Sequence, residues 1–145
     1  PDYIEKTKLM ELTPHVVLPN KHSLSSQTDI DITELAEEPF ILLDVPPSRE
    51  YFLGLFKAEG LSPNVVHSSP SLELVRGLVG YSLGFSLLVT RPVSDLTYDG
   101  QQLVIRPLRS NLNNSSIILA RHKDLRPTKL MKHFNDLAQE VLGAT

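Results

Sequence analysis

Hydroxyl side chains gather at two points where the sequence passes from a strand-like run to a helix-like run. Ser48 follows Pro46-Pro47, and three serines surround Pro70, namely Ser68, Ser69 and Ser71. The first turn of a helix offers free backbone N–H groups and the positive end of the helix dipole, so hydroxyls there suit a carboxylate or a phosphate. These residues predict a site for a small hydrogen-bonding molecule, such as an organic anion.

Each serine also has a simpler interpretation as a helix cap. Ser48 can cap the following helix by accepting a hydrogen bond from a backbone N–H two or three residues later. Ser69 at the cap position, with Pro70 at the first helical position, fits the next helix equally well. A cap needs only one hydroxyl, however, and the run from Ser68 to Ser71 contains three. The extra hydroxyls favour a ligand.

Catalytic and metal-binding patterns are not found in the sequence. The five histidines are scattered, and none forms an i,i+4 pair or an H-E-x-x-H motif (His15, His22, His67, His122 and His133). A triad of Ser69, His67 and Glu73 can be assembled on paper, but no G-x-S-x-G elbow accompanies it. We expect no metal, no cofactor and no enzymatic activity.

Three glycines follow the serine-rich turn. Gly77, Gly80 and Gly84 do not make a dinucleotide-binding fingerprint, because their spacing is wrong and no strand directly precedes them. Close backbone packing is the simpler explanation, with a left-handed turn at Gly84. The turn 81–84 precedes a strand, so it can approach a ligand only from a helix end.

The elements that must position these residues alternate between strands and helices. Strands are predicted at 16–18, 40–43, 64–67, 85–89, 103–105 and 117–120. Helices are predicted at 49–59, 72–79 and 128–142, with helical turns at 32–37 and with Pro127 at the first position of the last helix. This alternation favours a parallel or mixed sheet with helices on both faces, and the runs at 40–43, 64–67 and 85–89 predict buried strands. In such a sheet a ligand lies beyond the carboxyl ends of the strands, here residues 44–49, 67–71 and 89–93.

Composition places the chain among ordinary globular proteins. It has 145 residues, 41% of them hydrophobic, and a formal net charge of −3. It has no cysteine, which excludes disulfides and thiolate sites and favours the cytosol. No apolar run approaches the roughly 18 residues of a membrane span. Basic residues are concentrated in 106–132 without interleaved aromatics, so a solvated face or a surface for an acidic partner is favoured over nucleic acid.

An ordered series of short motifs carries a resemblance to a known family. The motifs are Leu35-Ala36-Glu37-Glu38-Pro39-Phe40-Ile41, Gly60-Leu61-Ser62-Pro63-Asn64-Val65, Ser71-Leu72-Glu73-Leu74-Val75-Arg76-Gly77-Leu78-Val79 and Ser82-Leu83-Gly84-Phe85. From about Leu12 to Val141 the chain resembles the C-terminal part of the effector-binding domain of LysR-type bacterial transcriptional regulators. Ser23 stands where that family usually has proline, and Ser82 stands where it usually has glycine, in a turn near the expected cleft.

The resemblance implies an α/β, periplasmic-binding-protein-like regulatory domain with two lobes. Residues from about 16 to 88 would form a complete second lobe, and residues from about 93 to 145 would be the returning C-terminal part of the first lobe. The DNA-binding winged helix-turn-helix would lie outside this chain, so operator DNA would be bound only through that N-terminal domain. Effector contacts are implied at the residues that match the family's motifs, namely Pro47, Ser48, Arg49, Ser68, Ser69, Ser71 and Gly84.

The function implied by the resemblance is sensing rather than catalysis. A small-molecule effector between the lobes would shift the conformation of a homodimer or homotetramer in the cytoplasm, and so change DNA binding and transcription. No membrane partner is expected. Two alternatives remain: a solute-binding protein of a transport system, which shares the two-lobed plan, and a small α/β enzyme.

Overall fold

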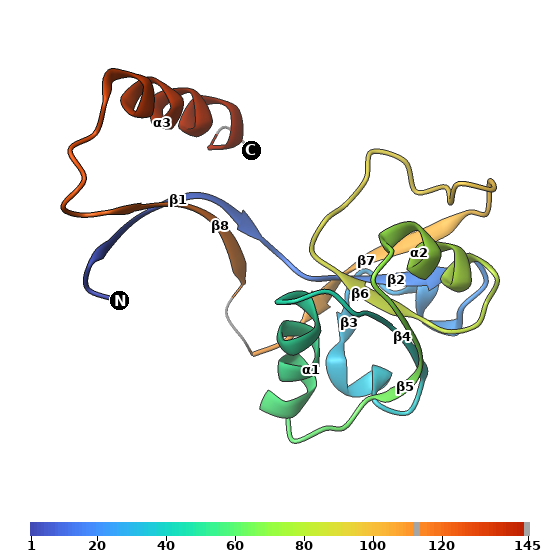
Figure 1. Cartoon of the computed structure of the whole chain (residues 1–145). Coiled ribbons are helices and arrows are strands. Elements are labelled where there is room, and N and C mark those ends of the chain that lie inside the picture. Colours follow the sequence, from blue (N-terminus) through green and yellow to red (C-terminus); the bar gives the residue numbers. More distant parts are fainter. Residues whose placement is uncertain (112–113, 144–145) are drawn as a thin grey trace. The chain divides into compact units, whose positions relative to one another are not determined.

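The computed structural model describes residues 1–111 and 114–143, which divide into two compact units (Figure 1). The larger unit contains residues 13–113, and the smaller unit contains residues 1–12 and 114–145. Among the described residues, no helix combines the length and the apolar character that a membrane crossing demands.

A mixed β-sheet forms the centre of the larger unit. Four of its strands are hydrogen-bonded in the order β3 (Ile30–Asp31), β7 (Leu103–Arg109), β2 (His15–Pro19) and β6 (Ser86–Leu88). Strand β2 is antiparallel to both β6 and β7, whereas β3 is parallel to β7. Strands β4 (Pro39–Leu43) and β5 (Asn64–Ser69) form a parallel pair.

The β4–β5 pair is joined to the edge of β6 through Phe85. The Ile41 N–H donates to the Phe85 carbonyl at 2.8 Å, and the Phe85 N–H donates to the Pro39 carbonyl at 2.9 Å. The buried hydroxyl of Ser86 donates to the carbonyl of Ile41 at 2.7 Å. Buried backbone groups at this junction are therefore paired, as the low polarity of the interior requires.

Helices cover both faces of this sheet, as the sequence predicts. Helix α1 (Ser48–Ala58) contributes Phe52 and Phe56 to a core cluster that contains Phe40, whereas helix α2 (Leu72–Gly80) contributes to a second cluster that contains Ile41. Phe40 and Ile41 are consecutive residues of β4, and consecutive strand side chains point to opposite faces. The expected α/β architecture is therefore confirmed.

Most predicted strands are present, but the environment of one differs from the prediction. Residues 64–67 were expected to be buried, yet β5 is exposed up to its last residue, with Val65 and Val66 each 42% exposed. The reason is that β5 pairs only with β4 and so lies at a sheet edge. The short 3₁₀ helix η2 (Ile32–Leu35) confirms the predicted helical turn, and Asp31 and Glu34 form a capping box around it. A second short helix, η1 (Ser23–Ser26), lies in the segment that follows β2.

The smaller unit pairs two long strands and one helix. Strand β1 (Ile4–Leu12) is antiparallel to β8 (Ser115–His122), and helix α3 (Lys129–Leu142) follows β8. The predicted start of α3 is shifted: Thr128 is the N-cap and accepts a hydrogen bond from the Met131 N–H at 3.2 Å, so Pro127 precedes the cap. A hydroxyl cap satisfies an otherwise free N–H, which proline at the first position cannot do.

The boundary between the units differs from the expected lobe boundary near residue 93. Strand β7 lies after that boundary in the sequence, but it pairs with β2 over five residue pairs from His15–Pro107 to Pro19–Leu103. These ladder hydrogen bonds place β7 in the larger unit, whereas the smaller unit resumes at Asn114.

Candidate functional site

A cavity of about 220 Å³ lies where strands β4 and β6 end. Four short segments line it: the end of β4 and the loop that follows, the start of α1, the start of α2, and the exit of β6. The lining residues are Leu43, Val45, Ser48, Phe52, Pro70, Leu72, Leu88, Val89 and Thr90. Ser48 and Thr90 supply its hydroxyl groups, and the other side chains are apolar. A mostly apolar pocket with a few polar groups, beyond the carboxyl ends of strands, is the usual form of a small-molecule site.

Ser48 is the predicted site residue that the structure places in the cavity wall. It is the first residue of α1 and is not the cap, because Pro47 occupies the N-cap position and no side chain caps this helix. The chain satisfies nearby groups through the backbone instead, since the Arg49 N–H donates to the Val45 carbonyl at 3.1 Å and the Tyr51 N–H to the Pro47 carbonyl at 3.1 Å. The cap prediction for Ser48 is therefore wrong, and its hydroxyl is not used for capping.

Arg49 lies beside the cavity without lining it. Its Nη1 atom is 3.0 Å from the Asp44 Oδ2 atom, and both side chains are partly exposed. This ion pair links the first turn of α1 to the loop that follows β4. Exposed pairs of this kind contribute about 0.2–1 kcal/mol, so the pair orients the loop more than it stabilises the fold.

The serine-rich turn has the hydroxyl roles shifted by two residues from the prediction. Ser71, not Ser69, is the N-cap of α2 and accepts a hydrogen bond from the Leu74 N–H at 3.3 Å. Ser69 is buried, and its Oγ atom accepts from the Ser71 N–H at 3.0 Å, which is a local turn that competes with capping. Ser68 is exposed on β5. Pro70, between these serines, lines the cavity.

The structure does not bring Gly84 together with Ser48. A Cβ atom at Gly84 would lie 2.4 Å from the carbonyl oxygen of Pro39, which begins β4, whereas the cavity lies where β4 ends. Close backbone approach explains this glycine. Ser82, two residues earlier, has φ of 61° in the left-handed region that glycine adopts most readily.

The apolar lining residues were not predicted from the sequence. Leu43, Phe52 and Leu88 read as ordinary core positions, and only packing shows that they leave a cavity. A signal for Thr90 was present, because residues 89–93 follow a predicted strand. No group of three or more His, Asp or Glu side chains among the described residues is arranged to hold a metal ion.

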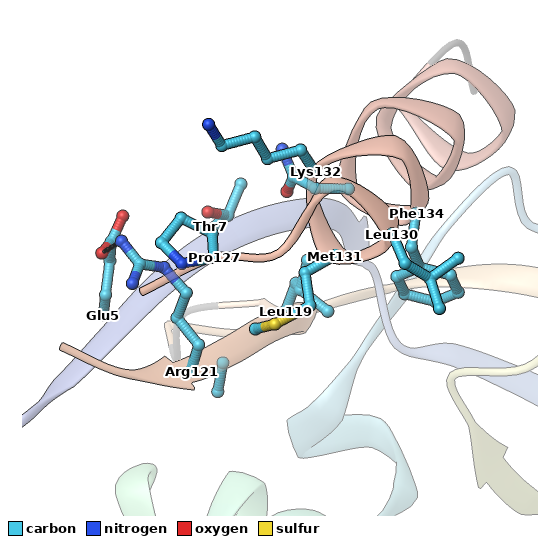
Figure 2. A pocket seen from close by; sticks show the side chains of 11 residues that line it. Glu5, Thr7, Leu119, Arg121, Pro127, Leu130, Met131, Lys132 and Phe134 are labelled. Atoms are coloured by element: carbon cyan, nitrogen blue, oxygen red, sulfur yellow. Dashed lines mark hydrogen bonds and ion pairs between the residues drawn. The ribbon is translucent and has the colours of Figure 1, made fainter. Parts of the chain in front are cut away.

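A larger hollow of about 560 Å³ lies in the smaller unit, between α3 and the β1–β8 pair. Figure 2 shows Arg121 and Glu5 against each other at one end, where they form an ion pair, and Leu130 and Phe134 at the other. Leu130 is 77% exposed and Phe134 is 58% exposed. The hollow is thus an uncovered apolar helix face rather than an enclosed ligand pocket.

His15, at the start of β2, carries an unusual titration. Burial lowers the pKa of its imidazole from the ordinary 6.5 to about 4, and the charge of Arg91 lowers this pKa further. Its Nε2 atom is buried and has no hydrogen-bond partner among the described residues. The folded protein therefore favours the neutral ring.

We expect the stability of the larger unit to fall on acidification because of His15. The unfolded chain takes up a proton near pH 6.5 and the folded chain only near pH 4, so this contribution is complete above pH 6.5 and is lost as the pH falls toward 4. The loss amounts to at most about 3 kcal/mol. Urea unfolding at several pH values measures it, and the slope between pH 6.5 and 4 should become flatter in His15→Gln. An equal slope in that variant would assign the effect to other groups.

Comparison with known proteins identifies the class. The family model described as LysR substrate binding domain matches residues 1–143, and the chain belongs to this family. HinK, a LysR family transcriptional regulator from Pseudomonas aeruginosa, is 44% identical with a TM-score of 0.92, over all of this chain and 51% of HinK. The HTH-type transcriptional regulator AlsR of Bacillus subtilis (strain 168) is 27% identical over 122 residues, which are 82% of this chain and 39% of AlsR.

A more distant structure shares the fold. The effector-binding domain of BenM with its effector benzoate is 19% identical, with a TM-score of 0.82 over 99% of this chain and 65% of that domain. The chain spans about half the length of HinK and less of AlsR. These relatives are named as regulators, which favours the regulatory interpretation over a transport protein or an enzyme.

Proposed function

We propose that this chain is the effector-sensing part of a LysR-type transcriptional regulator, and that a small organic anion binds in the 220 Å³ cavity. One observation carries the proposal: the cavity opens at the ends of β4 and β6, with Ser48 at a helix start that no side chain caps. Uncapped N–H groups and the helix dipole favour negative charge there by about 0.3–1 kcal/mol.

A carboxylate attached to an apolar body fits this cavity best. The hydroxyls of Ser48 and Thr90 and the free N–H groups of α1 can meet the carboxylate, while Leu43, Phe52 and Leu88 can cover the apolar part. Benzoate, the effector of the BenM domain, has this chemistry. We do not include Gly84 among the contacts, because it lies near the start of β4.

The proposed mechanism is a shift between conformations, without turnover. The larger unit would be the second lobe, and the smaller unit would be the returning part of the first lobe. An effector can shift the lobes only by binding one arrangement more tightly than the other. A homodimer or homotetramer in the cytoplasm would transmit the shift to a DNA-binding domain outside this chain.

A thermal-shift screen of the full-length protein tests this proposal. The panel contains small organic acids, including benzoate, each beside its neutral amide, such as benzamide. A true effector present at 100 times its Kd should stabilise the protein by about 2.7 kcal/mol and be recovered unchanged by mass spectrometry. Its amide should have a much smaller effect. Equal effects of acid and amide would exclude an anion site, and a chemically altered acid would indicate an enzyme.

A further inference from the structure

A buried arginine spans two parts of the larger unit that the cavity separates. Arg76, in the middle of α2, is only 4% exposed. Its Nη1 atom donates to the Glu73 Oε1 atom at 2.7 Å, and its Nη2 atom donates to the carbonyls of Ser94 at 2.7 Å and Leu96 at 3.0 Å. A buried guanidinium without such partners would be strongly unfavourable, so these bonds hold whenever the unit is folded.

The two ends of this arginine bridge lead to opposite walls of the cavity. Arg76 lies one helical turn after Leu72, whose side chain lines the cavity from α2. Its acceptors, Ser94 and Leu96, lie on the segment that continues from Thr90, the last lining residue at the exit of β6. The bridge therefore limits how far these two walls can separate.

Other contacts between α2 and the same segment lie farther from the cavity. A Cβ atom at Gly80 would lie 2.9 Å from the Gln101 Cβ atom, which shows how closely the chain packs there. The Tyr81 hydroxyl donates to the Asp99 Oδ2 atom at 2.6 Å in an exposed position. Both contacts lie at the end of α2 and not beside its first turn, so only the Arg76 bonds act close to the cavity wall.

We propose that Arg76 is a positioning residue for the effector cavity, which fixes the first turn of α2 against the exit of β6 without touching the effector. The consequence for affinity rests on the proposed function. Arginine suits this role better than lysine, because its planar fork directs separate N–H groups toward the Glu73 carboxylate and toward two carbonyls.

Amide hydrogen exchange in the full-length protein tests the positioning without any ligand. In Arg76→Gln we expect at least tenfold faster exchange at Leu74 and Val75, whose N–H groups donate to Ser71, as well as at Leu96. Arg76→Lys should give a smaller change. Tyr81→Phe, which removes the exposed contact between the same two segments, is the matched control and should leave Leu74 and Val75 unchanged.

Two results would overturn this inference. One is faster exchange at Leu96 alone, with Leu74 and Val75 at their wild-type rates. The other is the same uniform increase that Val79→Ala produces, because Val79 is a core residue of α2 and its truncation measures general loss of stability.

The affinity for benzoate provides the second readout. It should fall at least tenfold in Arg76→Gln but stay unchanged in Tyr81→Phe and Val79→Ala. If the wild type binds no carboxylate, the proposed function fails, and the exchange rates still decide whether Arg76 positions the walls. Unchanged affinity of Arg76→Gln for an acid that binds the wild type would count against the inference.

Discussion

Phe52→Ala is expected to lower the free energy of unfolding of the larger unit by about 3–5 kcal/mol. The Phe52 side chain has no exposed surface and belongs to the core cluster that includes Phe40 and Phe56. It also forms part of the cavity wall, so its truncation joins a new void to an existing one. Since the residual void grows, little relaxation can offset the lost contacts. Urea unfolding followed by far-UV circular dichroism measures the loss.

The control for Phe52 is an exposed residue on the same helix. Lys57→Ala removes a longer side chain from α1 but no core contact, and its effect should stay within about 0.5 kcal/mol. A loss below about 1 kcal/mol for Phe52→Ala would show that this side chain does not pack as described. An intact circular dichroism spectrum for both variants would establish that the comparison concerns folded proteins.

Ser48→Asp is expected to abolish the binding of an organic acid while leaving the fold intact. Aspartate in the first turn of α1 interacts favourably with the helix dipole, so folding should not suffer. The same carboxylate faces the proposed anion in the cavity, where like charges cost several kcal/mol. Affinity should fall at least about a hundredfold, since 1.4 kcal/mol corresponds to a factor of ten. Titration calorimetry of the full-length protein with benzoate, or with the strongest acid of the screen, measures it.

Ser48→Asn is the matched variant, because it has nearly the same size as the aspartate variant and carries no charge. Its affinity should fall far less. Ser68→Asp adds the same charge at an exposed position of β5 outside the cavity lining and should bind normally. Unchanged affinity in Ser48→Asp would place the anion elsewhere, and equal losses in both aspartate variants would reduce the effect to net charge.

The regular elements of the larger unit were predictable because local signals agreed with the packing. Helix α1 ends at Ala58, and Gly60 beyond it has φ of 70°, as its predicted position after the helix requires. Strand β1 was missed for a physical reason. Its ladder with β8 shifts register between Lys8 and Met10, so apolar and polar residues do not alternate along it.

The site was predictable only in part. A hydroxyl after two prolines at a strand end pointed to Ser48, whereas capping depended on which local hydrogen bonds compete best, and Ser71 prevailed over Ser69. A signal for Arg76 was present and overlooked. Leu72, Val75 and Val79 follow helical spacing, and Arg76 falls on the stripe that they define. A charged residue on such a stripe indicates a buried polar contact.

The strand order described above also determines when this chain can fold. In the larger unit Val17 pairs with Ile105, and in the smaller unit Lys6 pairs with Ala120, so the first strands of the chain must wait for partners near its end. Long loops have to close before these ladders reward the closure, which slows folding. During synthesis on the ribosome, β1 and β2 emerge early and stay unpaired until β7 and β8 follow. Their open edges over that interval are the stage at which the nascent protein depends most on chaperones.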